Sequence, residues 1–275
     1  CCGIIRSMSD SPILFLDSGI GGLAYYRYFH ARNPAETIIY LADRLNFPYG
    51  TKERTGLAAV ICSLVEKLHH KFRPKLVVIA CNTASVSALD TLRATFRDLP
   101  FVGTVPAVKP AVQESRTRRI GVLGTERTIE DPYIARLASR YGQDCTITGL
   151  AAPELVEFVE HGISGATALE RRRAVLPFIE QFRRCGVDAV VLGCTHFLFL
   201  REEFAQAGAP EMRIYDSVAG VARRAELLLE PLGRPESGTP QRSLLLVTGT
   251  MPLEGAWLHY AQSFDLELRL LQDIL

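Results

Sequence analysis

The stretch Val77–Ser85, VVIACNTAS, decides the fold, and it has a second copy in Val190–Phe197, VVLGCTHF. Each copy begins with a short run of mainly β-branched apolar residues, which is typical of a strand buried on both faces of a parallel sheet. Each run ends at a cysteine, Cys81 or Cys194, that small hydroxyl or amide residues follow. The sequence therefore predicts two buried parallel strands that each end in a cysteine.

Strand and helix patterns alternate along the rest of the chain. Helical patterns separate most of the strands, and the clearest covers residues 53–71, where apolar residues recur at spacings of three, four and seven. Such alternation favours doubly wound parallel sheets. The expected strands are 13–17, 37–42, 76–80, 101–105, 119–124, 146–150, 188–193, 213–215, 243–248 and 266–271.

A faint duplication indicates two similar α/β lobes. One half of the sequence has a strand before Asp17–Ser18 and a strand before Cys81, and the other has a strand before Cys194 and a strand before Asp216–Ser217. The two prolines of Pro106–Val112 suggest a crossing between lobes. Because sites in open α/β sheets lie at the carboxyl ends of strands, two lobes that face each other would bring both cysteines to one cleft.

Composition excludes several classes of protein. The 275 residues carry 31 Lys and Arg against 30 Asp and Glu, so no charge excess points to nucleic acid or an anionic membrane. No apolar run approaches the roughly 18 residues that a membrane span needs. Seven cysteines without regular spacing indicate a reducing cytosol rather than a disulfide scaffold. We expect no secretory signal, and we interpret Met8 as the initiator and Cys1 and Cys2 as part of an extension.

Cys81 is expected where a strand meets the N-terminus of a helix. Such a position lowers a thiol pKa from about 8.5 towards roughly 3.5–7.5 and yields a reactive thiolate. With Cys194 it suggests an active site of two thiols, although two buried core cysteines are the plainer alternative. A zinc site that uses Cys194, His196 and Cys81 is a rival, but the Cys-x-His spacing is poor for zinc, so we expect no metal.

Other polar residues near these strand ends are candidates for substrate contacts. His196 can orient or protonate a substrate group, because its pKa lies near working pH. Asp17 and Ser18 could be only a turn and a helix cap, and Glu160 could be only a solvated helix end. The remaining candidates, which offer hydroxyl, amide and backbone donors to a carboxylate, are Tyr49, Gly50, Asn82 and Thr83.

Six blocks occur in order between residues 13 and 217: DSGIGGL, DRLNFPYGTK, ACNTAS, VPAVKPA, GVLGT and LGCTH. On these blocks the chain resembles the glutamate racemases, cofactor-independent members of the aspartate/glutamate racemase superfamily. The resemblance implies interconversion of L- and D-glutamate in the cytoplasm, which supplies D-glutamate for bacterial peptidoglycan. It implies two pseudo-symmetric α/β lobes with the active site between them, the first formed by 1–104 and 217–275 and the second by 105–216.

By the family pattern, Cys81 acts on the D enantiomer with help from Asp17, and Cys194 acts on the L enantiomer with help from Glu160 and His196. A two-base racemization needs one proton carrier on each face of the substrate, and two thiols meet that need without a metal or pyridoxal phosphate. The resemblance implies that the substrate is held by Asp17, Ser18, Tyr49, Gly50, Asn82, Thr83, Thr195 and His196.

Two departures from the family pattern concern the packing around the second cysteine. Phe197–Leu198 stands where the family often has Tyr-Pro, and Ala152–Pro153 stands where it often has Cys-Pro. The alternatives left open are an aspartate or hydantoin racemase, a non-catalytic ligand-binding protein of the same fold and a metal-dependent hydrolase. Family members are often dimers, so the resemblance allows a homodimer without requiring one.

Overall fold

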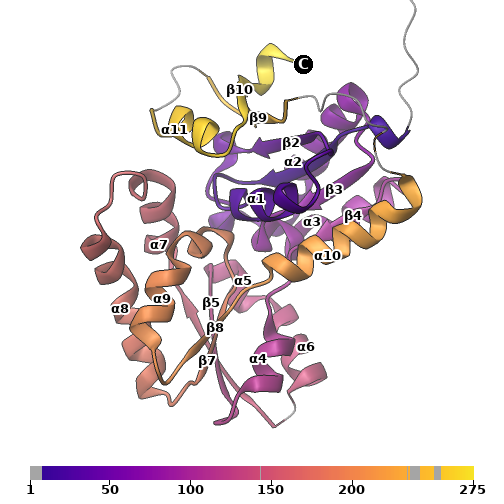
Figure 1. Ribbon diagram of the computed structural model, residues 1–275. Coiled ribbons are helices and arrows are strands. Elements are labelled where there is room, and N and C mark those ends of the chain that lie inside the picture. Colours follow the sequence, from indigo (N-terminus) through magenta and orange to yellow (C-terminus); the bar gives the residue numbers. More distant parts are fainter. Residues whose placement is uncertain (1–7, 143, 234, 236–241, 251–254) are drawn as a thin grey trace, which may run out of the picture. The chain divides into compact units, whose positions relative to one another are not determined.

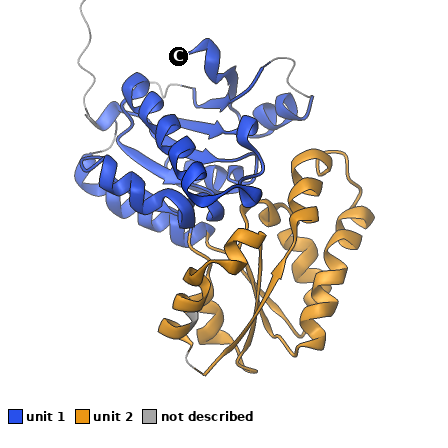
Figure 2. Ribbon diagram, turned by 180° about the vertical axis from the view of Figure 1, so that it is seen from behind, with its two compact units in different colours: residues 1–104, 218–275 blue, residues 105–217 orange. Residues whose placement is uncertain are grey.

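The computed structural model (Figure 1) describes residues 8–142, 144–233, 235, 242–250 and 255–275. The chain divides into two compact units (Figure 2), Cys1–Thr104 with Val218–Leu275, and Val105–Ser217. The residues interpreted as an extension, Cys1 and Cys2, lie outside the described residues. In the described part, no helix is both long and apolar enough to span a membrane.

The first unit is built on a six-stranded sheet in which every strand is parallel to its neighbours. The strand order is β10-β9-β2-β1-β3-β4. The strands are β1 (Ile13–Asp17), β2 (Ile38–Ala42), β3 (Leu76–Ile79), β4 (Phe101–Gly103), β9 (Leu244–Val247) and β10 (Glu267–Leu270). The helices are α1 (Leu23–Arg32), α2 (Arg54–Phe72), α3 (Asn82–Thr95), α10 (Val218–Leu229) and α11 (Gly255–Ser263), with short 3₁₀ turns at Met8–Asp10, Arg44–Asn46 (η2), Tyr49–Thr51 (η3), Glu230–Leu232 and Leu271–Asp273.

Helices cover both faces of this sheet. Because both faces are buried, the sequences of its strands are continuous apolar runs. In β1, Leu14 and Leu16 join the core that α2 and α3 form on one face. The side chain between them, Phe15, points to the opposite face and packs on Phe29 of α1, with ring centroids 5.6 Å apart. Figure 1 shows α1 on the sheet between β2 and β3.

The second unit has a four-stranded parallel sheet in the order β6-β5-β7-β8. Its strands are β5 (Arg119–Gly124), β6 (Thr146–Ala151), β7 (Ala189–Leu192) and β8 (Arg213–Tyr215). Its helices are α4 (Val108–Glu114), α5 (Glu126–Glu130), α6 (Pro132–Tyr141), α7 (Pro153–Glu157), α8 (Ala168–Arg184) and α9 (Arg201–Gly208), with a π turn at Phe158–Gly162 and a 3₁₀ helix, η5, at Thr195–Leu200.

The predicted fold class, two pseudo-symmetric parallel α/β lobes, is confirmed. The order β2-β1-β3-β4 in the first unit corresponds strand by strand to β6-β5-β7-β8 in the second. Cys81 follows β3 and Cys194 follows β7, so the two cysteines occupy equivalent places. Asp17 and Asp216 do not, because Asp17 ends β1 whereas Asp216 follows β8, the counterpart of β4.

Two local features differ from the expectation. The segment Pro106–Val112, interpreted as a crossing, contains the start of α4. Its Pro110 is the third residue of that helix, where the missing N–H would have had no partner within the helix. The helix expected to run through Glu160 instead changes to the π turn after Glu157, a change that the sequence pattern does not signal.

Gly121 of β5 provides a test of the second unit's packing. A Cβ atom on Gly121 would lie 2.6 Å from Cε1 of Phe182, a fully buried ring on α8. We expect Gly121→Ala to lower the free energy of unfolding by about 1–3 kcal/mol, because the ring has no room to yield. Urea denaturation followed by circular dichroism measures this, and Gly165→Ala, with no atom within 4 Å of the new methyl, is the control. Equal stability of both variants would contradict the prediction.

Candidate active site

The two cysteines stand at equivalent corners between a strand and a helix. Cys81 immediately precedes α3 and has φ −144° and ψ 125°, and Cys194 immediately precedes η5 and has φ −136° and ψ 139°. Both side chains are buried, and within the described residues neither cysteine belongs to a disulfide. Each sulfur is therefore fixed at the carboxyl edge of its sheet, where open α/β folds place their ligands.

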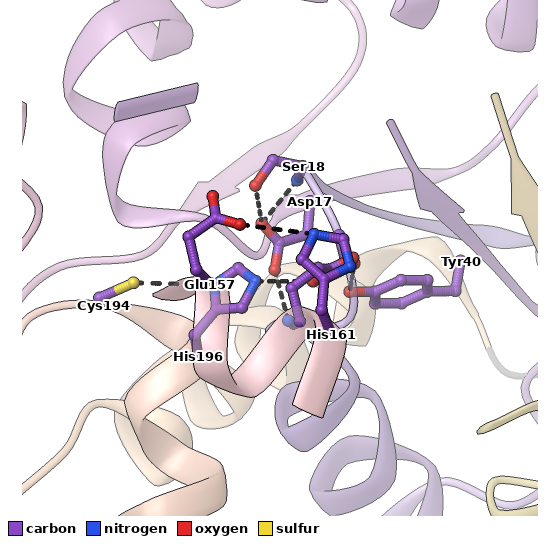
Figure 3. Close-up of polar contacts among 10 residues, drawn as sticks. Asp17, Ser18, Tyr40, Glu157, His161, Cys194 and His196 are labelled. Carbon is purple, nitrogen blue, oxygen red and sulfur yellow. Dashed lines mark hydrogen bonds and ion pairs between the residues drawn. The ribbon is translucent and has the colours of Figure 1, made fainter. Parts of the chain in front are cut away.

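Around Cys81, the neighbouring strand β1 contributes a buried carboxylate. The amide of Ala80 donates to the carbonyl oxygen of Leu16 at 2.8 Å, which holds the ends of β3 and β1 side by side. Asp17 then accepts the Ser18 amide at 2.6 Å, the Ser18 hydroxyl at 3.4 Å and the Gly22 amide (Figure 3). The carboxylate thus closes the glycine-rich turn that follows β1.

Gly22 has no room for a side chain. A Cβ atom there would lie 2.8 Å from the Tyr40 hydroxyl and 2.9 Å from Ala80. Tyr40 in turn donates its hydroxyl to the carbonyl oxygen of Gly19 at 2.8 Å (Figure 3). Glycine at position 22 therefore lets the start of α1 approach the end of β3, beside Cys81.

Tyr49 is tied to a carboxylate that the sequence analysis did not single out. Its buried hydroxyl donates to Oδ2 of Asp43 at 2.7 Å. Burial first, and then the charge of Asp43, hold the pKa of Tyr49 well above its usual range, with smaller contributions from Cys81 and Asp17. Tyr49 and Cys81 also belong to the same buried cluster. The Tyr49 hydroxyl has one proton and donates it to Asp43, so towards any other group it can act only as a hydrogen-bond acceptor.

Asn82 begins α3 directly after Cys81 and is 3% exposed. Within the described residues, neither the nitrogen nor the oxygen of its side-chain amide has a hydrogen-bond partner. Leaving a buried polar group unpaired costs about 1–3 kcal/mol, so such a group calls for an explanation. Thr83, the next residue, is also buried. The first turn of α3 therefore places an amide beside the thiol, available to a polar ligand.

In the second unit, Cys194, His196 and Glu160 form one buried chain of contacts. The Cys194 sulfur lies 3.7 Å from Nδ1 of His196, and Nε2 of His196 lies 2.9 Å from Oε2 of Glu160 (Figure 3). Burial alone would lower the pKa of His196, but its contacts with Cys194 and Glu160 outweigh burial and raise that pKa well above its usual range. Thr195, between the cysteine and the histidine, is also buried. The arrangement favours an imidazolium beside the thiol.

The π turn places Glu160 in this chain of contacts. Such turns are rare and are frequently found at functional sites. The Glu160 side chain is 2% exposed, so the plainer interpretation of a solvated helix end is wrong. The two departures from the family pattern near this site, Ala152 and Phe197, are both fully buried and apolar.

The predicted site residues thus gather within each unit. The first unit brings together Asp17, Ser18, Tyr49, Gly50, Cys81, Asn82 and Thr83 at one sheet edge, and the second gathers Glu160, Cys194, Thr195 and His196. Asp43 and Tyr40 were missed, although the position of Asp43 directly after an apolar strand could have pointed to it. Across the described residues, no group of three or more His, Cys, Asp or Glu side chains is arranged to hold a metal.

Comparison with known proteins agrees with this geometry. The Asp/Glu/Hydantoin racemase family model matches residues 14–225. A glutamate racemase from Treponema pallidum is 39% identical over 254 residues, 92% of this chain and 93% of the relative. One from Sphingopyxis alaskensis is 40% identical over 233 residues, covering 84% of this chain and 87% of the relative.

A solved structure shows the same relationship. The glutamate racemase of Escherichia coli, in complex with L-glutamate and the activator UDP-MurNAc-Ala, has a TM-score of 0.85 and 32% identity, covering 94% of this chain and 97% of that one. The chain therefore belongs to the Asp/Glu/Hydantoin racemase family and is an isomerase.

Proposed function

We propose that this isomerase interconverts L- and D-glutamate with two cysteines and no cofactor. The observation that carries the proposal is the repeated placement of a buried cysteine after the equivalent strand of each unit, Cys81 after β3 and Cys194 after β7. The relatives named above are glutamate racemases, and the Escherichia coli structure contains L-glutamate, which supports glutamate as the substrate.

In the proposed reaction the two sulfurs flank the α-carbon. The Cys81 thiolate removes the α-proton of D-glutamate, and the electron pair of the broken C–H bond stays on the substrate as a carbanion. The Cys194 thiol then gives its proton to the opposite face, which forms L-glutamate and leaves a Cys194 thiolate. The reverse reaction runs from that state, so each direction begins with a different thiolate.

Residues beside each cysteine have separate tasks in this proposal. The amino acid is held by the amide of Asn82, the hydroxyls of Ser18, Thr83 and Thr195 and the backbone at Gly50. Those donors that point at the substrate carboxylate stabilise the negative charge that develops on it. The imidazolium of His196, held by Glu160, stabilises the Cys194 thiolate. Asp17 assists on the Cys81 side, both through its charge and by shaping the turn that Ser18 begins.

The proposal extends to the cell. We infer that the D-glutamate formed in the cytoplasm supplies peptidoglycan synthesis, because the relatives reported above are bacterial glutamate racemases. A homodimer is compatible with the proposal but not part of it. An aspartate or hydantoin racemase and a non-catalytic protein of this fold are the rivals, and the first experiment below separates them.

The purified protein should exchange the α-hydrogen of glutamate for deuterium in deuterated water without any added cofactor. Proton removal by either thiolate followed by return from solvent-equilibrated thiol requires this exchange. Proton NMR of both glutamate enantiomers, with L-aspartate and a hydantoin as parallel substrates, measures it. Exchange with aspartate or the hydantoin alone would assign the chain to that rival, and no exchange at all would leave a non-catalytic protein.

Replacing either Cys81 or Cys194 with serine should reduce racemization by on the order of 10²–10⁴-fold, because a serine hydroxyl is a far weaker acid than a thiol and supplies almost no anion to remove the α-proton. Circular dichroism at the wavelength of glutamate's optical activity follows the rate in both directions. Cys62→Ser is the control, since Cys62 is a half-buried thiol on α2, away from the carboxyl edge of the sheet. Wild-type rates in Cys81→Ser or Cys194→Ser would remove that cysteine from the mechanism.

Glu160→Gln should move the high-pH decline of L-glutamate turnover to lower pH. The pKa of His196 is raised partly by Glu160, so loss of the carboxylate lowers that pKa, and the imidazolium that supports the Cys194 thiolate is lost earlier as pH rises. The pH dependence of kcat/KM for L-glutamate reports this change.

A matched control for Glu160→Gln lies one turn earlier in the chain. Glu157 forms an exposed pair with His161, with 3.5 Å between Oε2 and Nε2, and both side chains are more than half exposed. Glu157→Gln should leave the pH profile in place. Profiles that coincide for Glu160→Gln and the wild type would show that His196 does not act as an imidazolium in this step.

A further inference from the structure

The loop that carries Tyr49 and Gly50 is organised by one buried carboxylate, Asp43. Oδ2 of Asp43 accepts the Tyr49 hydroxyl at 2.7 Å, and Oδ1 accepts the Thr248 hydroxyl at 2.7 Å. The side-chain amide of Asn46 donates to both oxygens, at 3.1 and 3.0 Å. Asp43 is fully buried, so its charge is stabilised by these donors rather than by bulk water.

Thr248 connects this loop to the C-terminal part of the chain. It follows directly after β9, and its hydroxyl both donates to Asp43 and accepts the amide of Leu45 at 2.9 Å. Its own amide donates to the carbonyl oxygen of Ala42 at 3.1 Å, which continues the pairing of β9 with β2. One hydroxyl thus joins the end of β9 to both the carboxylate and the backbone of the loop.

A second bond joins the same two segments. Nη2 of Arg44 donates to the carbonyl oxygen of Thr250 at 3.2 Å. This contact is exposed, whereas the contacts of Thr248 and Asp43 are buried. Because hydrogen bonds to a buried charged group are the stronger class, the Thr248–Asp43 contact should contribute more to holding the loop.

The loop held in this way lies against the proposed site. The turn η3, which contains Tyr49 and Gly50, contacts α3, and Tyr49 and Cys81 belong to the same buried cluster. Loss of the Thr248 hydroxyl would leave one oxygen of Asp43 and the Leu45 amide without this partner. The loop would then rearrange, and Tyr49 and Gly50 would move with it.

We propose that Thr248 and Asp43 are positioning residues that hold the Tyr49–Gly50 loop in its substrate-binding position. The inference rests on the proposed function, in which that loop contacts the amino acid. Neither residue handles a proton of the substrate. Their loss therefore weakens substrate binding and raises KM, while the proton transfers by the two cysteines, and with them kcat, change little.

The decisive variant is Thr248→Val, which keeps the side-chain shape and removes the hydroxyl. We expect the KM for both glutamate enantiomers to rise by about tenfold, the effect of losing one charge-assisted hydrogen bond, with kcat within about threefold of wild type. Asp43→Asn should act in the same direction. Thr248→Ser restores the hydroxyl and should bring KM back to within about twofold of the wild-type value.

The strand pair β2–β9 offers a control at its opposite end. Ser243 precedes β9, is buried, and its hydroxyl accepts the amide of Ile38 at 3.0 Å. Ser243→Ala thus removes a buried side-chain-to-backbone bond between the same two strands at the edge away from the loop. It should lower the thermal midpoint without raising KM, so it separates loss of stability from loss of loop position.

Hydrogen exchange measured by mass spectrometry adds a readout that does not depend on turnover. Amides of residues 44–51 should exchange faster in Thr248→Val than in Ser243→Ala. An active wild type with an unchanged KM in Thr248→Val, or an equal rise of KM in Ser243→Ala, would overturn this inference alone. An inactive wild type would instead overturn the proposed function, and the exchange rates would still report whether Thr248 holds the loop.

Discussion

In a parallel sheet the carboxyl ends of all strands lie at the same edge, and the candidate site depends on that constraint. In the first unit, the residue before Cys81 donates its amide to Leu16 at 2.8 Å, which places Asp17 beside the cysteine. In the second unit, Gly193 donates to Leu123 at 2.6 Å in the equivalent way. A Cβ atom on Gly193 would lie 2.9 Å from that carbonyl oxygen, so glycine permits the close approach. The same bond thus fixes each cysteine.

In the proposed mechanism, the two units would stabilise a cysteine thiolate by different means. Cys81 precedes a 14-residue α-helix, whose first-turn amides and dipole favour a thiolate. Cys194 precedes a 3₁₀ helix of six residues, which offers a weaker dipole and poorer hydrogen-bond geometry. The positive charge beside Cys194 would come instead from the imidazolium of His196, which Glu160 stabilises. In the proposed mechanism, the two equivalent cysteines would therefore form thiolates with the help of different neighbouring groups.

The sequence allowed prediction of features that local patterns determine. The apolar runs before Cys81 and Cys194 predicted their strands, and the spacing within 53–71 predicted α2, observed at Arg54–Phe72. The π turn at Glu160 and the helix α4 across Pro110 could not be predicted, because tertiary packing decides them. The contact of Asp43 with Thr248 joins residues 205 positions apart, and no local pattern can indicate such a pairing. Local sequence patterns predict which helix or strand a residue belongs to, whereas the topology of the sheet decides which distant residues it contacts.

The C-terminal strands show why that topology matters. The shared pattern of the two units has four strands, and β9 and β10 extend the first sheet beyond it on the side of β2. Since β2 ends at Ala42, directly before Asp43, a strand added there ends beside the loop that Asp43 organises. The tail carries none of the six sequence blocks that indicate the family, yet its position gives it a hydroxyl within 2.7 Å of that carboxylate. A segment whose sequence gives little indication of function can therefore support a site, because its strand ends at the sheet edge where the site lies.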